Sequence, residues 1–140
     1  MLITVDPGQS VGVATWNGRQ LWGCGSGSYP INPTKGDIVW IESQVIYPHS
    51  KADPNDILTL AREAGRVAGR CEAFGAEVFW VKPSDWKGQL PKEIQHRRVW
   101  AALTEAEQAT LTQACRGMAP SKRHNVLDAV GIGLWVLKRK

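Results

Sequence analysis

The chain has 140 residues, of which 43% are hydrophobic and 21% charged, and its formal net charge is +4. These values are typical of one globular domain, spanning residues 1–140, with a core of its own. No apolar run is long enough to cross a bilayer, and the N-terminal residues have the pattern of a strand and not of a signal peptide. We therefore expect a protein without a membrane partner, and the positive charge favours a polyanionic one.

The three cysteines, Cys24, Cys71 and Cys115, form no CxxC pair and are odd in number. Their spacing suits neither a zinc site nor a disulfide framework, so we expect free thiols in a reducing cytoplasm. The glycine-rich residues 25–28 lack the Gly-Lys-Ser/Thr of a phosphate-binding loop. We predict that they form a connection, and we expect no nucleotide cofactor.

Short apolar and β-branched runs predict five strands, over residues 1–6, 11–16, 19–24, 37–42 and 77–81. Asn17-Gly18 lies between the second and third runs and is typical of a tight hairpin turn. The run at 37–42 is apolar almost throughout, which favours a central position in a sheet. Residues 82–92 are predicted to form a basic loop that carries Trp86.

Helical patterns occupy residues 53–74, 93–102, a short segment opening at Thr104, and 121–137. The first begins with an N-cap Asp53 followed by Pro54. Its apolar stripe comprises Ile57, Leu60, Ala64, Val67, Cys71 and Phe74. This stripe could pack on the sheet of the same chain or form the seam of a dimer, and its heptad-like spacing leaves both open.

Three acidic residues stand where their side chains could share one site. Asp6 and Glu42 each end a predicted strand, and Asp128 lies in the otherwise apolar last helix. A turn-capping role would explain Asp6 alone, but a carboxylate on a buried helix is costly unless it is paired or binds metal. Three carboxylates on rigid elements suit Mg²⁺ or Mn²⁺, and two such ions could support phosphodiester hydrolysis.

The order of these elements and acids resembles the ribonuclease-H-like nuclease superfamily and, within it, the RuvC-type Holliday-junction resolvases. The resemblance is carried by Asp6-Pro7-Gly8, Ile41-Glu42-Ser43, Trp86-Lys87-Gly88, Pro91-Lys92 and Asp128-Ala129. It implies an α/β fold with a five-stranded mixed sheet flanked by helices on both faces. The short length suggests a phage or phage-like member of the family.

The resemblance also implies a function: a homodimer that resolves four-way and other branched DNA by paired symmetric nicks, with two Mg²⁺ or Mn²⁺ ions per site. It assigns metal binding and catalysis to Asp6, Glu42 and Asp128, and a place near the scissile phosphate to Lys87 and Lys92. The family carries an Asp or His three residues before its final Asp. Here Asn125 holds that position and His124 precedes it, and we favour His124 as the fourth ligand because imidazole also transfers protons.

We expect DNA contacts from basic residues around this site and from the loop after Glu42. The candidates are Tyr47, Lys51, Lys87, Lys92, Arg97, Arg98, Lys122 and Arg123. Two alternatives remain open from the sequence. One is a nuclease of the same fold that cuts RNA or flaps, and the other is a DNA-binding protein of this fold that does not cleave.

Overall fold

A five-stranded mixed sheet forms the centre of the computed structural model, which describes residues 1–8, 10–27, 31–46, 48–49 and 51–139. The strands are β1 (Leu2–Asp6), β2 (Gly12–Asn17), β3 (Gln20–Ser26), β4 (Ile38–Glu42) and β5 (Glu77–Val81). Their order is β3-β2-β1-β4-β5. β1, β4 and β5 are parallel, whereas β2 is antiparallel to both of its neighbours.

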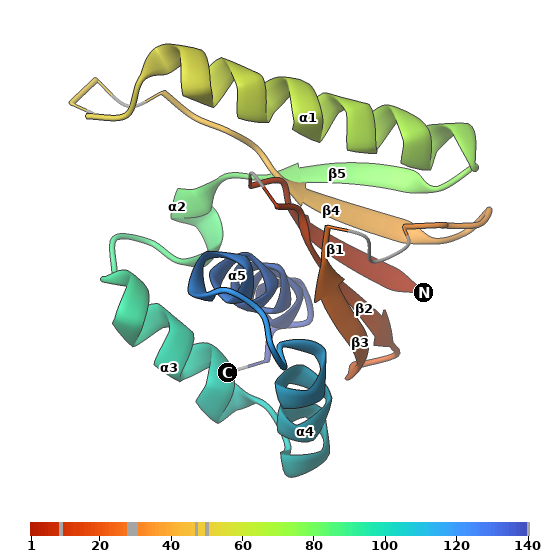
Figure 1. Ribbon diagram of the computed structural model, residues 1–140. Coiled ribbons are helices and arrows are strands. Elements are labelled where there is room, and N and C mark those ends of the chain that lie inside the picture. Colours follow the sequence, from red (N-terminus) through yellow and green to blue (C-terminus); the bar gives the residue numbers. More distant parts are fainter. Residues whose placement is uncertain (9, 28–30, 47, 50, 140) are drawn as a thin grey trace.

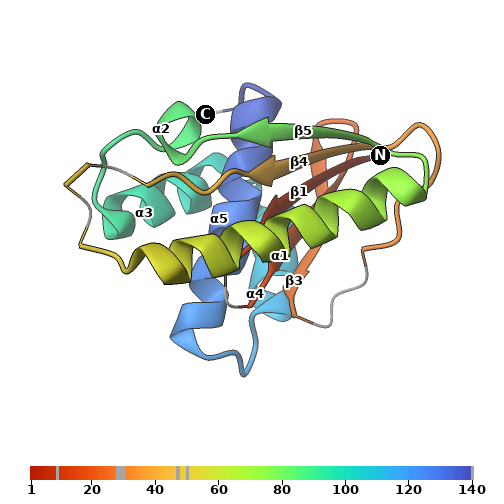
Figure 2. The same ribbon diagram turned by 90° about the horizontal axis from the view of Figure 1, so that it is seen from above.

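Helices cover both faces of this sheet (Figures 1 and 2). They are α1 (Pro54–Ala73), α2 (Pro83–Trp86), α3 (Lys92–Ala102), α4 (Glu105–Ala114) and α5 (Pro120–Val136). α1 lies along one face, and α5 crosses the other with α3 and α4 beside it (Figure 1). The expected architecture, a five-stranded mixed sheet flanked by helices on both faces, is confirmed.

The alternation of side chains along β1 divides the core into two layers. Ile3 and Val5 face α1 and pack in a cluster with Ala64 and Cys71, which are both almost fully buried. Ala64, Val67 and Cys71 of the apolar stripe therefore pack on the sheet of their own chain, whereas Phe74 at the end of the stripe is 49% exposed. Cys71 is a core residue. The capping predictions for α1 are also confirmed, since the Asp53 side chain accepts a hydrogen bond from the Asn55 N–H.

On the opposite face, hydrogen bonds lock α5 onto β1. The Thr4 hydroxyl donates to the carbonyl of Ala129 at 2.7 Å, and the Trp16 indole N–H donates to the Thr4 oxygen at 3.1 Å. Gly133 lies against the Trp16 ring so closely that a Cβ there would overlap it. The small residues of the last predicted helix thus allow a large indole to be fully buried beneath it.

Two predicted connections are wrong in part. Gly25 and Ser26 belong to β3, where they extend the pairing with β2. Residues 83–86 form the short helix α2, whose start is closed by a hydrogen bond from the Lys82 N–H to Asp85. None of the helices within the described part of the chain is long and apolar enough to cross a membrane.

A buried ion pair ties the hairpin of β2 and β3 to α4. Glu107 is 1% exposed, accepts a hydrogen bond from the Leu21 N–H, and pairs with the Arg139 guanidinium at 2.7 Å. Arg139 also donates to the carbonyls of Arg19 and Ala102. The hydrogen bonds that Glu107 accepts, first from Arg139 and then from the backbone N–H groups of Thr104 and Leu21, lower its pKa from 4.5 to about 2.

We expect Glu107→Gln to destabilise the fold in a pH-dependent way. Because folding lowers the pKa of Glu107, its ionised form stabilises fully above pH 4.5, and this contribution, about 3 kcal/mol, is lost as the pH falls toward 2. Urea unfolding at a series of pH values should show wild type and variant converging over that interval. Glu105→Gln, which changes an exposed acid on the same helix, should lose no more than about 1 kcal/mol. A constant difference between wild type and Glu107→Gln from pH 2 to 6 would contradict the assignment.

Candidate active site

Asp6 and Glu42 end two neighbouring parallel strands. Val5 of β1 lies opposite Ile41 of β4 in the register, so the two acids follow at the same edge of the sheet. Asp6 is 6% exposed and Glu42 is 7% exposed. The alternation that points Thr4 toward α5 gives Asp6 the same direction, because the two residues are two positions apart.

Asp128 completes a cluster of three acids from the α5 side. It is buried like the other two, and its negative charge reaches both of them. The pKa of Asp6 is raised well above its usual range, first by burial, then by the charges of Glu42 and Asp128. The three carboxylates predicted to share one site are therefore close enough to interact, although they come from three separate elements.

Close packing at the start of α5 makes this approach possible. A Cβ on Gly12 would overlap the backbone of Asn125, and one on Gly8 would press on the Asn125 side chain. The Asn125 amide donates a hydrogen bond to the carbonyl of Ser10 at 2.6 Å. Asn125 thus joins α5 to the connection after β1, and its amide nitrogen is directed at that backbone.

Trp86 holds Glu42 in place. Its indole N–H donates to Glu42 Oε2 at 2.8 Å, and Lys87 Nζ lies 4.0 Å from the same oxygen. Burial raises the pKa of Glu42, while the Lys87 charge and the Trp86 hydrogen bond oppose this rise. Trp86 is only 8% exposed and packs against Val81 and Ile132. The prediction of a loop at Trp86 is therefore wrong, because this residue ends the short helix α2 and its side chain is buried.

His96 is the site residue that the sequence analysis missed. Its Nε2 lies 2.9 Å from Asp128 Oδ1, and it reaches the site from α3. His124 lies beside it, with ring centroids 5.0 Å apart, and burial together with the Lys92 and His96 charges lowers the pKa of His124. Within the linear sequence His96 is one of a basic run, and only the packing of α3 on α5 brings it to Asp128.

The basic candidates occupy different positions around the acids. Lys87 and Lys92 are near enough to lower the pKa of Asp6 and to oppose the rise at Glu42. Arg97 and Arg123 line a groove that also contacts both histidines. Arg98, Lys122 and Lys51 are exposed, and Tyr47 lies outside the described residues.

The three acids are not arranged so that they could all bind one metal ion. Among the described residues, no three His, Cys, Asp or Glu side chains are disposed to hold one ion. One oxygen of Glu42 accepts from Trp86, and one oxygen of Asp128 contacts His96. The three carboxylates match in kind the oxygen donors that bind Mg²⁺ or Mn²⁺.

The electrostatic coupling within the cluster can be measured directly. We expect Glu42→Gln to lower the pKa of Asp6, because it removes the neighbouring negative charge that raises this pKa most. Asp128→Asn should lower the pKa of Asp6 by a smaller amount, and Lys87→Met should raise it. Carboxyl-carbon NMR titration in metal-free buffer would follow Asp6. An unchanged Asp6 titration in all three variants would show that the carboxylates do not share a site.

No family model matches the chain, and no curated protein matches it in sequence. Among solved structures it is similar to Thermus thermophilus RuvC in complex with a Holliday junction substrate. The TM-score is 0.47 and the identity 17%, over 96% of this chain and 90% of that one. A second T. thermophilus RuvC structure gives a TM-score of 0.44 and 18% identity, over 96% and 91% of the two chains. Both are structures of RuvC, the type of protein that the motifs of this sequence resemble.

Proposed function

We propose that this protein is a divalent-metal-dependent nuclease that hydrolyses phosphodiester bonds in branched DNA, including four-way junctions. One observation carries the proposal: three buried carboxylates, Asp6, Glu42 and Asp128, converge from β1, β4 and α5. Burying like charges together costs free energy that a purely structural role does not explain. A bound cation would offset that cost, because it would neutralise the repulsion between the carboxylates.

Asp6, Glu42 and Asp128 would hold the ions, with His124 as the preferred additional ligand and Asn125 as the alternative. When bound, two Mg²⁺ or Mn²⁺ ions would activate a water molecule and stabilise the leaving oxygen. Asn125 would ligate through its Oδ1 while its Nδ2 keeps the hydrogen bond to the carbonyl of Ser10. His124 is preferred because an imidazole can also transfer protons.

The neighbouring side chains have separate tasks in this proposal. Trp86 and His96 are positioning residues, since they hold one oxygen each of Glu42 and Asp128. Lys87 stands beside Glu42 and would meet the phosphate at the site, where a positive charge stabilises the transition state more than the ground state. Lys92, whose charge reaches both Asp6 and His124, would contact an adjacent phosphate.

Further DNA contacts would come from basic residues flanking the site. We propose Tyr47, Lys51, Arg97, Arg98, Lys122 and Arg123 for this role. The net charge of +4 supports a polyanionic substrate. The preference for branched DNA over other nucleic acids is supported by the motifs shared with RuvC-type resolvases, and the substrate panel below tests it.

We expect Asp6→Asn and Asp128→Asn each to abolish cleavage, with a loss in rate on the order of 10³-fold, because each variant lacks a proposed metal ligand. Removing negative charge from a crowded cluster should leave the fold intact and should not weaken DNA binding. The measurement is nicking of synthetic four-way junctions, flaps and RNA–DNA hybrids with Mg²⁺ and with EDTA, alongside circular dichroism. Near wild-type cleavage by either variant, or cleavage in EDTA, would contradict the metal assignment.

We further propose that the active form is a homodimer joined along α1, because paired nicks need two sites. The inward positions of α1 are occupied by its own sheet, so the seam would use the outward face. There Leu58 is 55% exposed, and a Cβ on Gly65 or Gly69 would meet nothing within 4 Å. Two such faces could approach closely.

Gly65→Gln should convert the dimer to a monomer without harming the fold, since glutamine is a better helix former than glycine and points into open space. Gly65→Ala is the matched control, because it adds helix stability without bulk and should leave the dimer intact. Sedimentation at micromolar concentration would measure both. A wild type that sediments as a monomer with junction bound would contradict the dimer.

A further inference from the structure

A groove between α3, α4 and α5 lies next to the acidic site, and most of its lining residues have no role in the chemistry described above. One part has a volume of about 410 Å³ and is lined by Trp100, Leu111, Thr112, Cys115, Arg116, Gly117, Met118, Arg123 and Leu127. A second part of about 450 Å³ shares Trp100, Arg123 and Leu127 and continues to His96 and His124. The groove therefore runs from the histidines beside Asp128 to the far end of α4.

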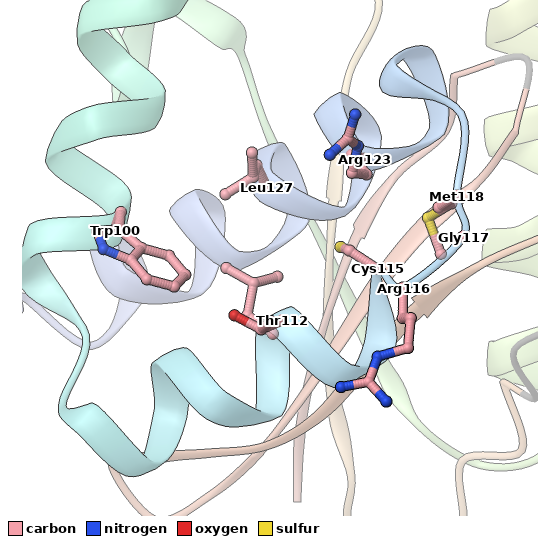
Figure 3. Close-up of a pocket in the computed structure, with 9 residues that line it drawn as sticks. Trp100, Thr112, Cys115, Arg116, Gly117, Met118, Arg123 and Leu127 are labelled. Carbon is pink, nitrogen blue, oxygen red and sulfur yellow. The ribbon is translucent and has the colours of Figure 1, made fainter.

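Trp100 forms one wall of this groove. It projects from α3 toward Thr112 of α4, with Leu127 of α5 nearby (Figure 3), and it is 42% exposed. An indole so exposed, beside apolar side chains, is suited to accept a flat apolar partner by stacking.

Positively charged side chains line the groove beside its apolar residues. Arg97, Arg116 and Arg123 line the two parts of the groove, and Glu93 is the only acid among the lining residues. In the described part of the chain, none of these three arginines belongs to an ion pair. Three available guanidinium groups around an aromatic wall match a base with its flanking phosphates.

We propose that this groove binds an unpaired nucleotide of a DNA strand, with its base stacked on Trp100 and its flanking phosphates held by Arg97, Arg116 and Arg123. The proposal rests on the nuclease function proposed above, because the occupant is taken to be part of the strand that reaches the acids. The groove continues to His96 and His124, so a nucleotide bound in it would lie beside the strand at the three carboxylates. Branched DNA with a flap or a gap at its branch point supplies such unpaired nucleotides.

The test is the affinity for a fluorescent thymidine oligonucleotide in EDTA, so that no cleavage occurs. Trp100→Ala should bind about tenfold more weakly, as expected for loss of one stacked base. Trp22→Ala is the matched control, because Trp22 is 64% exposed on β3 and lines neither part of the groove, and its affinity should stay within about twofold of wild type. Thermal unfolding of both variants would report their stability.

A second measurement uses the wild type alone and so does not depend on how a variant folds. An oligonucleotide carrying 5-iododeoxyuridine should photo-crosslink to Trp100, identified by peptide mass spectrometry. Poly-glutamate should compete weakly. Absence of the Trp100 crosslink, unchanged affinity in Trp100→Ala, or poly-glutamate competing as well as DNA would each overturn the groove proposal. Wild-type cleavage alongside such a result would leave the nuclease function standing, whereas Trp100-dependent binding without any cleavage would reject the nuclease function alone.

Discussion

The rest of the structure depends on one electrostatic constraint: three carboxylates are buried within reach of one another where β1, β4 and α5 meet. Like charges in a poorly solvated place repel strongly, and burial together with that repulsion raises the pKa of Asp6. Such an arrangement persists only if the surrounding elements are held firmly. The fixed position of α5 across the sheet is therefore as much a part of the site as the acids are.

Several contacts maintain that position. Thr4 joins the backbone of α5 to β1, and Trp16 supports Thr4 from beneath. Gly12 lets the start of α5 approach β2 within the space that a side chain would occupy. α2 and α3 then supply Trp86 and His96 as hydrogen-bond partners, which orient Glu42 and Asp128 respectively.

Much of this could be predicted from the sequence because it depends on local patterns. The five strands follow from short apolar runs, the tight turn from Asn17-Gly18, and α1 from the Asp53 cap. The three acids could be selected because each breaks an apolar pattern at a place where a charge is costly. Their expected convergence was inferred from the placement of Asp6 and Glu42 at strand ends and of Asp128 in the last helix, and the parallel pairing of β1 with β4 brings the first two together.

What could not be predicted depends on contacts between distant segments. His96 meets Asp128, and Trp86 meets Glu42, through the packing of α3 and α2 on the α5 face of the sheet, which no local periodicity encodes. In the sequence Trp86 stands among lysines and prolines, which suggested an exposed loop. Its burial against Val81 and Ile132 is a tertiary effect that overrides that local composition. The groove at Trp100 depends in the same way on how three helices meet.

The place of α5 in the chain also has a consequence for when the site can form. β1 to β4 and α1 are synthesised first, whereas α5, which covers one face of β1 and β2, is synthesised last among these elements. Contacts between such distant segments must wait for the chain that joins them. A partly synthesised chain would thus present Asp6 and Glu42 without Asp128, and the core around Trp16 would still be open. Assembly of the carboxylates and closure of the core are therefore the same event, and a chain that has not finished folding has no complete site.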